Sequence, residues 1–381
     1  MSVDDLAPLL SVPGVEPACD APPDDTARRD AERFVAALYH GILNREPSAD
    51  EIAAWAAPLT LDQTDVVGYV ADMAATFLTS EERQRIDAER AAPPPEPEPI
   101  PTTAPLFAPA GHFYSPVVDV SEAERHLARL AAQPLPETLP GLRLDRARMV
   151  SAWQDLLPHL LAVPLPDQPT PGFRYCYDNP AYSYGDGATL YALIRRHRPQ
   201  RIIEIGCGWS SACLLDAIDR ELAGACEVTF VEPYPDLLYR LAGTPWPGHR
   251  VINSGIQDVP LEEFERLEAN DILFIDSTHV VKTGSDVVYE LLDILPRLKT
   301  GVLVHIHDIF WPFEYPSDWV VQQNRSWNEL YALRAFLAHN TAWDIEFFGN
   351  YLTQMEATRV RRDFPRMIRN AGGAIWLRRI A

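Results

Sequence analysis

Two alternating kinds of segment make up the chain from Arg201 onward. Short apolar runs, typical of strands buried on both faces, are separated by longer stretches whose apolar residues recur at helical spacing. This alternation predicts an α/β fold in which a parallel sheet carries helices on both faces. The predicted strands are 202–205, 227–231, 249–252, 271–275, 302–306, 343–348 and 374–380.

The patterns before Arg201 predict further parts of the chain. Apolar residues recur at helical spacing in 29–91, whereas 92–109 contains eight prolines, which favour an extended, semi-rigid spacer. Ser48 and Glu51 have the spacing of a capping box at a helix start. We therefore predict a disordered tail (1–28), a helical domain (29–91), a proline-rich linker (92–110), a helical lead-in (111–172) and the α/β domain (173–381).

Composition narrows the classes of partner. The 381 residues carry a formal net charge of −21, which would repel nucleic acid and an anionic membrane surface. The five cysteines are scattered and form no Cys-x-x-Cys pair, so neither a zinc site nor a disulfide framework is expected. The sequence has no signal peptide and no apolar run near the roughly 18 residues of a membrane span. We predict a soluble, cytoplasmic protein without a nucleic-acid or membrane partner.

A glycine turn, Gly206-Cys-Gly208, joins the first strand to a helix that begins near Trp209. Strand, turn and helix start together predict a cradle of backbone N–H groups. Ser211 stands where a dinucleotide-binding fold has its third glycine, and Glu204 inside the strand would repel a pyrophosphate but attract an ammonium group. These two residues favour S-adenosylmethionine, which has an ammonium group and no phosphate.

The stretch Glu204-x-Gly206-x-Gly208 resembles the first motif of class I S-adenosylmethionine-dependent methyltransferases. Two late strands after five strand–helix units are also similar to the sheet of that family. The resemblance covers 173–381 and implies a Rossmann-like seven-stranded sheet with S-adenosylmethionine as cofactor, Gly206 leaving room for its methionine end. It implies cofactor contacts at Glu204, Gly206, Cys207, Gly208, Ser210, Glu232, Pro233 and Asp276.

Three positions near strand ends have more particular roles in this interpretation. Glu232, after the second strand, can hold both hydroxyls of a ribose, the role that the family gives to this acid. Gln257, after the third strand, is expected either to pair with the adenine edge or to lie on the surface. Tyr184 ends an aromatic stretch that begins at Phe173, which is expected either to fold over the cofactor or to pack as a cover on the sheet.

Asp276 and His279 follow the fourth strand, and His307 and Asp308 follow the fifth. Because the carboxyl ends of parallel strands meet at one edge, these side chains predict the catalytic centre. In one interpretation, Asp276, His307 and Asp308 hold a divalent metal, Mg2+ or Mn2+, that lowers the pKa of a substrate hydroxyl. Metal-dependent O-methyltransferases for catechols and macrolide sugars are similar here, although they usually have Asp or Glu in place of His307.

In a second interpretation no metal takes part. His279, with Asp276 nearby, takes the proton from the attacking hydroxyl, and His307 is the second candidate for this base. His279 resembles the histidine of the Asp-x-x-His stretch in several small-molecule methyltransferases. His305 alternates with His307 along the fifth strand and is expected to be a core histidine with its hydrogen bonds satisfied.

An aromatic loop after Asp308 contains Trp311, Phe313 and Tyr315, which are expected either to stack on the acceptor or to form a hydrophobic cap. The whole pattern predicts transfer of the methyl group of S-adenosylmethionine to a hydroxyl of a small molecule or glycan. The rivals are a nucleotide-sugar or NAD-binding enzyme on the same sheet and a non-catalytic scaffold.

The segment Phe34–Pro47 resembles a small bacterial helical domain of unknown function that also occurs attached to glycan-modifying enzymes. This helical domain has no cluster of catalytic residue types. We expect it to bind a protein partner or to drive oligomerisation.

Overall fold

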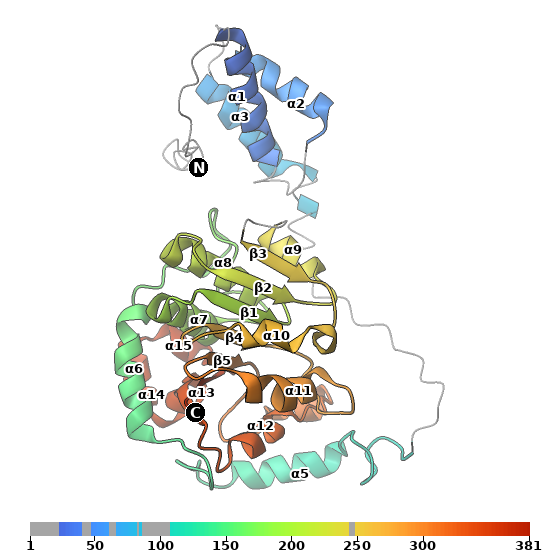
Figure 1. Ribbon diagram of the computed structural model, residues 1–381, viewed down its shortest axis with the longest axis vertical. Coiled ribbons are helices and arrows are strands. Elements are labelled where there is room, and N and C mark those ends of the chain that lie inside the picture. The colour runs from blue at the N-terminus through green and yellow to red at the C-terminus, as the bar shows by residue number, and fades with distance from the viewer. Residues whose placement is uncertain (1–22, 40–46, 61–65, 82–83, 86–106, 244–247) are drawn as a thin grey trace. The chain divides into compact units, whose positions relative to one another are not determined.

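The computed structural model describes residues 23–39, 47–60, 66–81, 84–85, 107–243 and 248–381 (Figure 1). The chain divides into two compact units, Met1–Pro95 and Glu96–Ala381. Most of the predicted tail and linker lies outside the described residues, and the predicted domain boundaries stay predictions. None of the helices in the described part of the chain is long and apolar enough to span a membrane.

The N-terminal unit is helical, as its sequence pattern predicts. Its described elements are α1 (Pro23–Leu38), α2 (Ala49–Ala56), a 3-10 turn (Ala57–Thr60) and α3 (Val66–Thr79). The capping box at Ser48 and Glu51 is present, with both reciprocal hydrogen bonds. A small core packs between the helices and includes Val35, Tyr39, Met73 and Phe77.

Helix α1 begins at Pro23, inside the segment that was predicted to be a disordered tail. Proline suits the first turn of a helix because its φ angle is already helical and its missing N–H would have no partner there. Helix α1 thus extends into residues 23–28 of the predicted tail.

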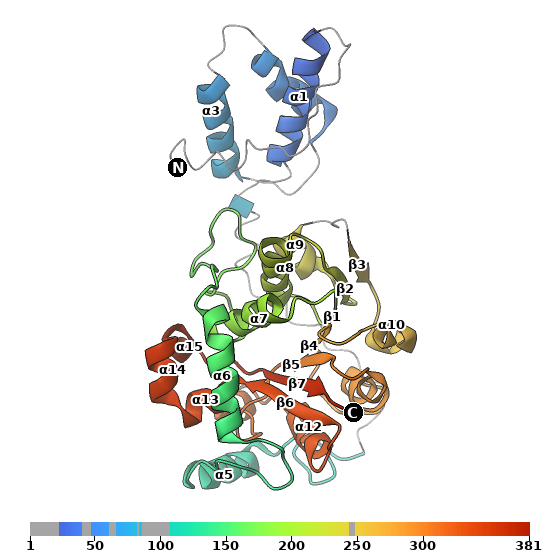
Figure 2. The same cartoon turned by 60° about the vertical axis from the view of Figure 1, so that its left-hand side comes forward.

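The second unit is built on a seven-stranded sheet in the order β3-β2-β1-β4-β5-β7-β6 (Figure 2). Its strands are β1 (Arg201–Ile205), β2 (Glu227–Val231), β3 (His249–Ile252), β4 (Ile272–Ile275), β5 (Leu303–Ile306), β6 (Trp343–Phe348) and β7 (Ile375–Arg379). The first five strands run parallel, and β7 runs antiparallel between β5 and β6. The predicted Rossmann-like seven-stranded sheet is confirmed, and β7, which alone runs against the other strands, makes it a mixed sheet.

Helices cover both faces of this sheet, with α6 and α7 on one side and α10 and α12 on the other (Figure 2). Helix α7 packs against α6, α8 and α15. The helices of the unit are α5 (Val120–Ala131), α6 (Arg146–Leu160), α7 (Tyr184–His197), α8 (Trp209–Leu222), α9 (Asp236–Ala242), α10 (Leu261–Glu265), α11 (Asp286–Tyr289), α12 (Glu329–Leu337), α13 (Gly349–Met355), α14 (Ala357–Asp363) and α15 (Arg366–Arg369).

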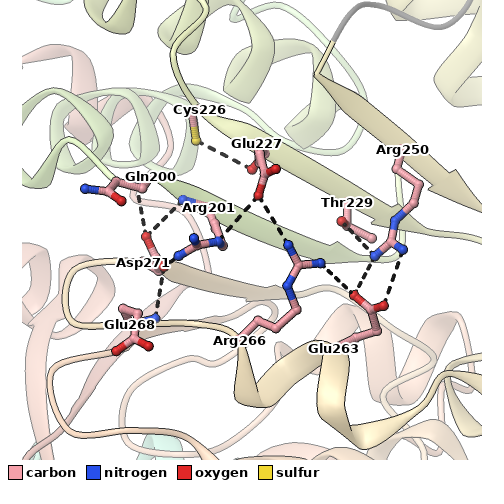
Figure 3. A network of polar contacts seen from close by, with 10 residues as sticks. All are labelled: Gln200, Arg201, Cys226, Glu227, Thr229, Arg250, Glu263, Arg266, Glu268 and Asp271. Atoms are coloured by element: carbon pink, nitrogen blue, oxygen red, sulfur yellow. Dashed lines mark hydrogen bonds and ion pairs between the residues drawn. The ribbon is translucent and has the colours of Figure 1, made fainter.

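A polar network holds the amino ends of the central strands together (Figure 3). The buried carboxylate of Asp271, just before β4, accepts hydrogen bonds from the backbone N–H groups of Gln200, Arg201 and Glu268, each at 2.9 Å. It also pairs with the guanidinium of Arg201 at 3.4 Å. Because Asp271 ties the start of β1 to the start of β4, the register of these strands also fixes where their carboxyl ends meet.

Candidate active site

The carboxyl ends of β2, β1, β4 and β5 lie next to one another in the sheet. This order brings most of the predicted site residues to one edge: the glycine turn after β1, Glu232 after β2, Asp276 after β4, and His307 with Asp308 after β5. The glycine turn with Glu232 forms one half of the site, and the acid–histidine group forms the other.

Gly206 connects the two halves. Its φ angle is +77°, and a β-carbon at this position would lie 1.8 Å from the carbonyl oxygen of Asp276. Glycine is therefore required here because the main chain of β4 passes too close for any side chain. The predicted role of Gly206, leaving room for the methionine end of a cofactor, stays a prediction. Gly208, by contrast, is extended, and its added β-carbon would only touch Leu237 at 3.4 Å.

The backbone N–H groups of the glycine turn are already used within the chain. That of Gly206 donates to the carbonyl of Val231 at 3.1 Å, and that of Cys207 donates to Glu232 Oε2 at 3.1 Å. The N–H of Gly208 donates to Ser211 Oγ at 3.0 Å and so caps α8. These three N–H groups therefore have partners within the chain, and the predicted cradle, which also includes the N–H groups at the start of α8, stays a prediction.

Glu204 is the buried acid of this half. Its side chain is fully buried, and its Oε1 accepts a hydrogen bond from the hydroxyl of Ser210 at 2.6 Å. Its Oε2 has no hydrogen-bond partner within the described structure. Burial raises the pKa of Glu204 to about 8, despite the hydrogen bonds from serine. An unpartnered carboxylate oxygen in such a place fits a cationic group such as an ammonium.

Glu232 is held against the glycine turn by two backbone contacts, from Cys207 N–H at 3.1 Å and from Tyr234 N–H at 2.8 Å. Each carboxylate oxygen keeps a further lone pair that can accept from a hydroxyl. The loop that carries Glu232 is fixed by Asn253, whose amide nitrogen donates to the carbonyls of Glu232 and Pro233 at 3.1 and 2.7 Å. Glu232 is thus positioned for a vicinal diol such as that of a ribose.

Two other predicted cofactor contacts have partners inside the chain. Gln257 is exposed, and its amide nitrogen donates to the carbonyl of Gly284 at 2.9 Å. The ring of Tyr184 stacks on Tyr177 at a centroid distance of 5.1 Å and lies 4.0 Å from the guanidinium of Arg369. These contacts agree with the structural alternatives given above, a surface glutamine and a packed aromatic cover.

His279 is the centre of the second half of the site. Its Nδ1 lies 2.8 Å from Glu329 Oε2, and its Nε2 lies 3.4 Å from Asp276 and 3.5 Å from Asp308. Burial alone would lower the pKa of His279, but the bonds to Asp276 and Glu329 outweigh burial and raise it well above its usual value. The three neighbouring acids therefore favour the protonated form of His279.

The start of α12 holds His279 in place. The backbone of His279 is left-handed, with φ +60°, and its carbonyl accepts hydrogen bonds from the N–H groups of Asn328 and Glu329, both at 3.1 Å. The side chain of Asn328 also accepts from the N–H of Val281 at 2.6 Å. Glu329 was not among the residues predicted from sequence, because nothing in its local pattern connects it to a loop after β4.

His307 lies beside the same acids. Its Nε2 is 3.5 Å from Asp308 Oδ1, and its pKa is raised because Asp276, Asp308 and Asp186 outweigh the effect of burial. Burial would raise the pKa of Asp276, but His307 and His279 lower it to about 2. The two imidazoles therefore supply the positive charge that offsets the buried carboxylates.

The arrangement does not fit a metal ion. Within the described ranges, no three side chains of His, Cys, Asp or Glu are placed so that they could hold one, and this includes the predicted set Asp276, His307 and Asp308. The physical reason is that Asp276 and Asp308 both face imidazole nitrogens.

A further acid of this half, Asp186, lies in the first turn of α7 and is buried. The N-cap of α7 is Ser183, and the carboxylate of Asp186 accepts a hydrogen bond from the N–H of Gly373 at 3.1 Å. Burial raises the pKa of Asp186 to about 6. Asp186 thus contacts the segment that leads into β7.

The remaining predictions concern packing. His305 is a core residue, stacked on Phe274 at 3.9 Å, but neither ring nitrogen has a hydrogen-bond partner among the described residues, so the prediction of satisfied hydrogen bonds is wrong. Trp311, Phe313 and Tyr315 are all buried and pack on other aromatic rings, as the cap interpretation predicts.

The α/β unit is similar to known proteins. Residues 203–309 match the model of a methyltransferase domain family. An uncharacterized protein of Archaeoglobus fulgidus is 28% identical over 166 residues, 43% of this chain and 75% of that protein.

Two solved structures are also similar. One is the Podospora anserina methyltransferase PaMTH1 with bound S-adenosylhomocysteine, at 15% identity and TM-score 0.33, covering 74% of this chain and all of that one. The other is the Streptomyces achromogenes O-methyltransferase TomG with bound S-adenosylmethionine, at 14% identity and TM-score 0.31, covering 68% of this chain and 96% of that one.

The contact between Gly206 and Asp276 predicts that substitution of Gly206 destabilises the protein more than substitution of Gly208. Gly206→Ala should lower the free energy of unfolding by roughly 2–4 kcal/mol, because the main chain of β4 must move and the left-handed backbone is strained. Gly208→Ala, the matched control, should leave thermal stability nearly unchanged. Thermal unfolding of both variants measures this, and equal melting temperatures would contradict the steric account.

The burial of Glu204 predicts that the affinity for S-adenosylhomocysteine depends on pH. In the free protein its pKa is about 8, so it is mostly protonated at neutral pH. The ammonium of a bound ligand favours the carboxylate form of Glu204, so binding releases a proton. The affinity for S-adenosylhomocysteine should therefore rise from about pH 6 to about pH 8 and then level off. Calorimetric titration at several pH values measures the effect. Glu204→Gln should bind more weakly with a flat profile, and a flat wild-type profile would remove Glu204 from the site.

Proposed function

We propose that the S-adenosylmethionine-dependent methyltransferase domain of this chain transfers the methyl group to a hydroxyl of a small molecule or glycan. One observation carries the proposal: two kinds of side chain lie at the same edge of the sheet. Glu204 can bind a cation and Glu232 can bind a diol, and His279 with its neighbouring acids lies beside them. Glu204 and Glu232 serve the cofactor, and His279 with its acids serves the acceptor.

The residues of the first half fit the cofactor in charge and in hydrogen bonding. Glu204 presents an unpartnered buried oxygen that suits the ammonium, and Glu232 presents two acceptors for the ribose hydroxyls. When bound, S-adenosylmethionine supplies a methyl group on a sulfonium, which a nucleophilic oxygen can take. Ser210 positions Glu204, and Ser211 caps α8 beneath the turn.

The residues of the second half fit the removal of a proton. The acceptor oxygen would form a bond to the methyl carbon while the carbon–sulfur bond breaks and the sulfur keeps the electron pair. The base is the neutral form of His279, which is the minor form because Asp276 and Glu329 raise its pKa. The proton on Nε2 first leaves to water, and Nε2 then takes the proton of the attacking hydroxyl. Asp276 and Asp308 then stabilise the imidazolium that forms, while Glu329 holds Nδ1. His307, beside the same acids, is the second candidate for this base.

The two alternative functions considered from the sequence, a nucleotide-sugar or NAD-binding enzyme and a non-catalytic scaffold, have less support. A nucleotide-sugar or NAD site needs free N–H groups at the glycine turn, and here all three are used within the chain. A scaffold without activity would have no need for the buried charges around His279. The N-terminal helical unit we propose as an interaction module; the glycan preference follows only from its resemblance, and the cytoplasmic location stays a prediction.

The role of His279 predicts a loss of turnover without a loss of cofactor binding. His279→Ala should lower the rate of S-adenosylhomocysteine formation by roughly 100-fold or more with a panel of sugars and phenols. Its affinity for S-adenosylhomocysteine should stay close to that of the wild type, because Glu204 and Glu232 are untouched. Mass spectrometry of the products measures transfer, and unchanged turnover would exclude His279 as the base.

A divalent cation is the alternative account of the same residues. The imidazole–carboxylate pairs predict that turnover and affinity for S-adenosylhomocysteine are unchanged after EDTA treatment and dialysis. If activity instead disappears and returns with Mg2+ or Mn2+, then the side chains rearrange around a metal and the charge-balance account is wrong.

A further inference from the structure

Arg325 has an unusual environment close to the acid–histidine group. It lies between a short π-helix (Asp318–Gln322) and α12, and its backbone N–H donates to the carbonyl of Trp319 at 2.9 Å. Its guanidinium lies 4.2 Å from the ring centroid of Trp319 and 4.4 Å from that of Trp327. Among the residues that the structure describes, none accepts a hydrogen bond from this guanidinium or pairs with it.

This environment leaves the chemistry of the side chain unused. Stacking on aromatic rings holds the plane of a guanidinium, and its N–H donors at the edge stay available. Arg325 is also half-buried rather than extended into water. By comparison, Arg359 on α14 is engaged with Glu356 at 3.0 Å. Proteins use a guanidinium of fixed orientation, partly shielded from water and with free N–H donors, to bind oxyanions through bidentate hydrogen bonds.

The position connects Arg325 to the catalytic group. Trp327, on which the guanidinium lies, has its ring centroid 4.4 Å from that of His279. The next two residues, Asn328 and Glu329, are the ones that hold His279 by its carbonyl. Burial raises the pKa of Asp308, and the charge of Arg325 is one of the influences that work against this rise. Arg325 is thus one aromatic ring away from the proposed base.

We propose that Arg325 binds an oxyanion of the acceptor, a carboxylate, phosphate or sulfate group, while the hydroxyl to be methylated lies at His279. The proposal rests on the proposed function and names its substrate class: hydroxyl compounds that carry an anionic group. Arg325 is then a specificity-determining residue, and acceptors without the anionic group bind more weakly.

The test uses inorganic phosphate as the probe, with the full chain saturated with S-adenosylhomocysteine and ionic strength held constant with chloride. Calorimetric titration of the wild type should show saturable phosphate binding. Arg325→Gln should weaken it at least about tenfold, the fold-change that loss of a charge-assisted two-pronged contact produces. Arg325→Lys should recover part of the affinity, and Arg359→Gln, the matched control, should behave as the wild type.

A second arm compares catechol with 3,4-dihydroxybenzoate, which differ by one carboxylate. The wild type should bind the dihydroxybenzoate more tightly, and Arg325→Gln should remove the difference. Absence of saturable phosphate binding in the wild type, or equal binding by Arg325→Gln, would overturn the proposal. Affinity for S-adenosylhomocysteine, measured on each preparation, separates this failure from failure of the cofactor site and reports whether each variant is folded.

Discussion

The close approach of the glycine turn to the main chain of β4 is the constraint on which the site depends. The N–H of Asp276 donates to the carbonyl of Ile205 at 2.9 Å, and the carbonyl of Asp276 lies where a β-carbon of Gly206 would be. On the other side, the N–H of Gly206 donates to Val231 at the end of β2. One residue without a side chain thus joins three strand ends and places the cofactor half beside the acid–histidine half.

Charge balance is the second determinant of the site. Three carboxylates, those of Asp276, Asp308 and Glu329, surround His279, and His307 adds a second imidazole. Buried carboxylates are costly unless paired, and removal of one partner leaves the other charge uncompensated. His307 stands where the similar metal-dependent O-methyltransferases usually have Asp or Glu. This histidine therefore makes the site a set of ion pairs and not a set of oxygen ligands for a metal. The same pairs hold the imidazole that the proposed proton transfer needs.

Features that depend on neighbouring residues were predicted from the sequence, whereas contacts between residues far apart in the sequence were not. The strands, the glycine turn and Glu232 at the end of β2 follow from patterns within a few neighbouring residues. The partners of the turn's N–H groups were not predicted, because they depend on where the side chains of Glu232 and Ser211 point. Glu329 and Arg325 were missed for a similar reason: they reach the site through the packing of α12 on the loop after β4, which no local pattern encodes.

We propose that Glu204 and Glu232 hold S-adenosylmethionine at the glycine turn, with its sulfur directed toward His279. A crystal structure with S-adenosylhomocysteine tests it most directly. The account predicts the ligand's ammonium within about 3 Å of the Glu204 carboxylate and its ribose hydroxyls on Glu232. A ligand bound elsewhere, or one whose ammonium and ribose leave Glu204 and Glu232 without contact, would contradict it.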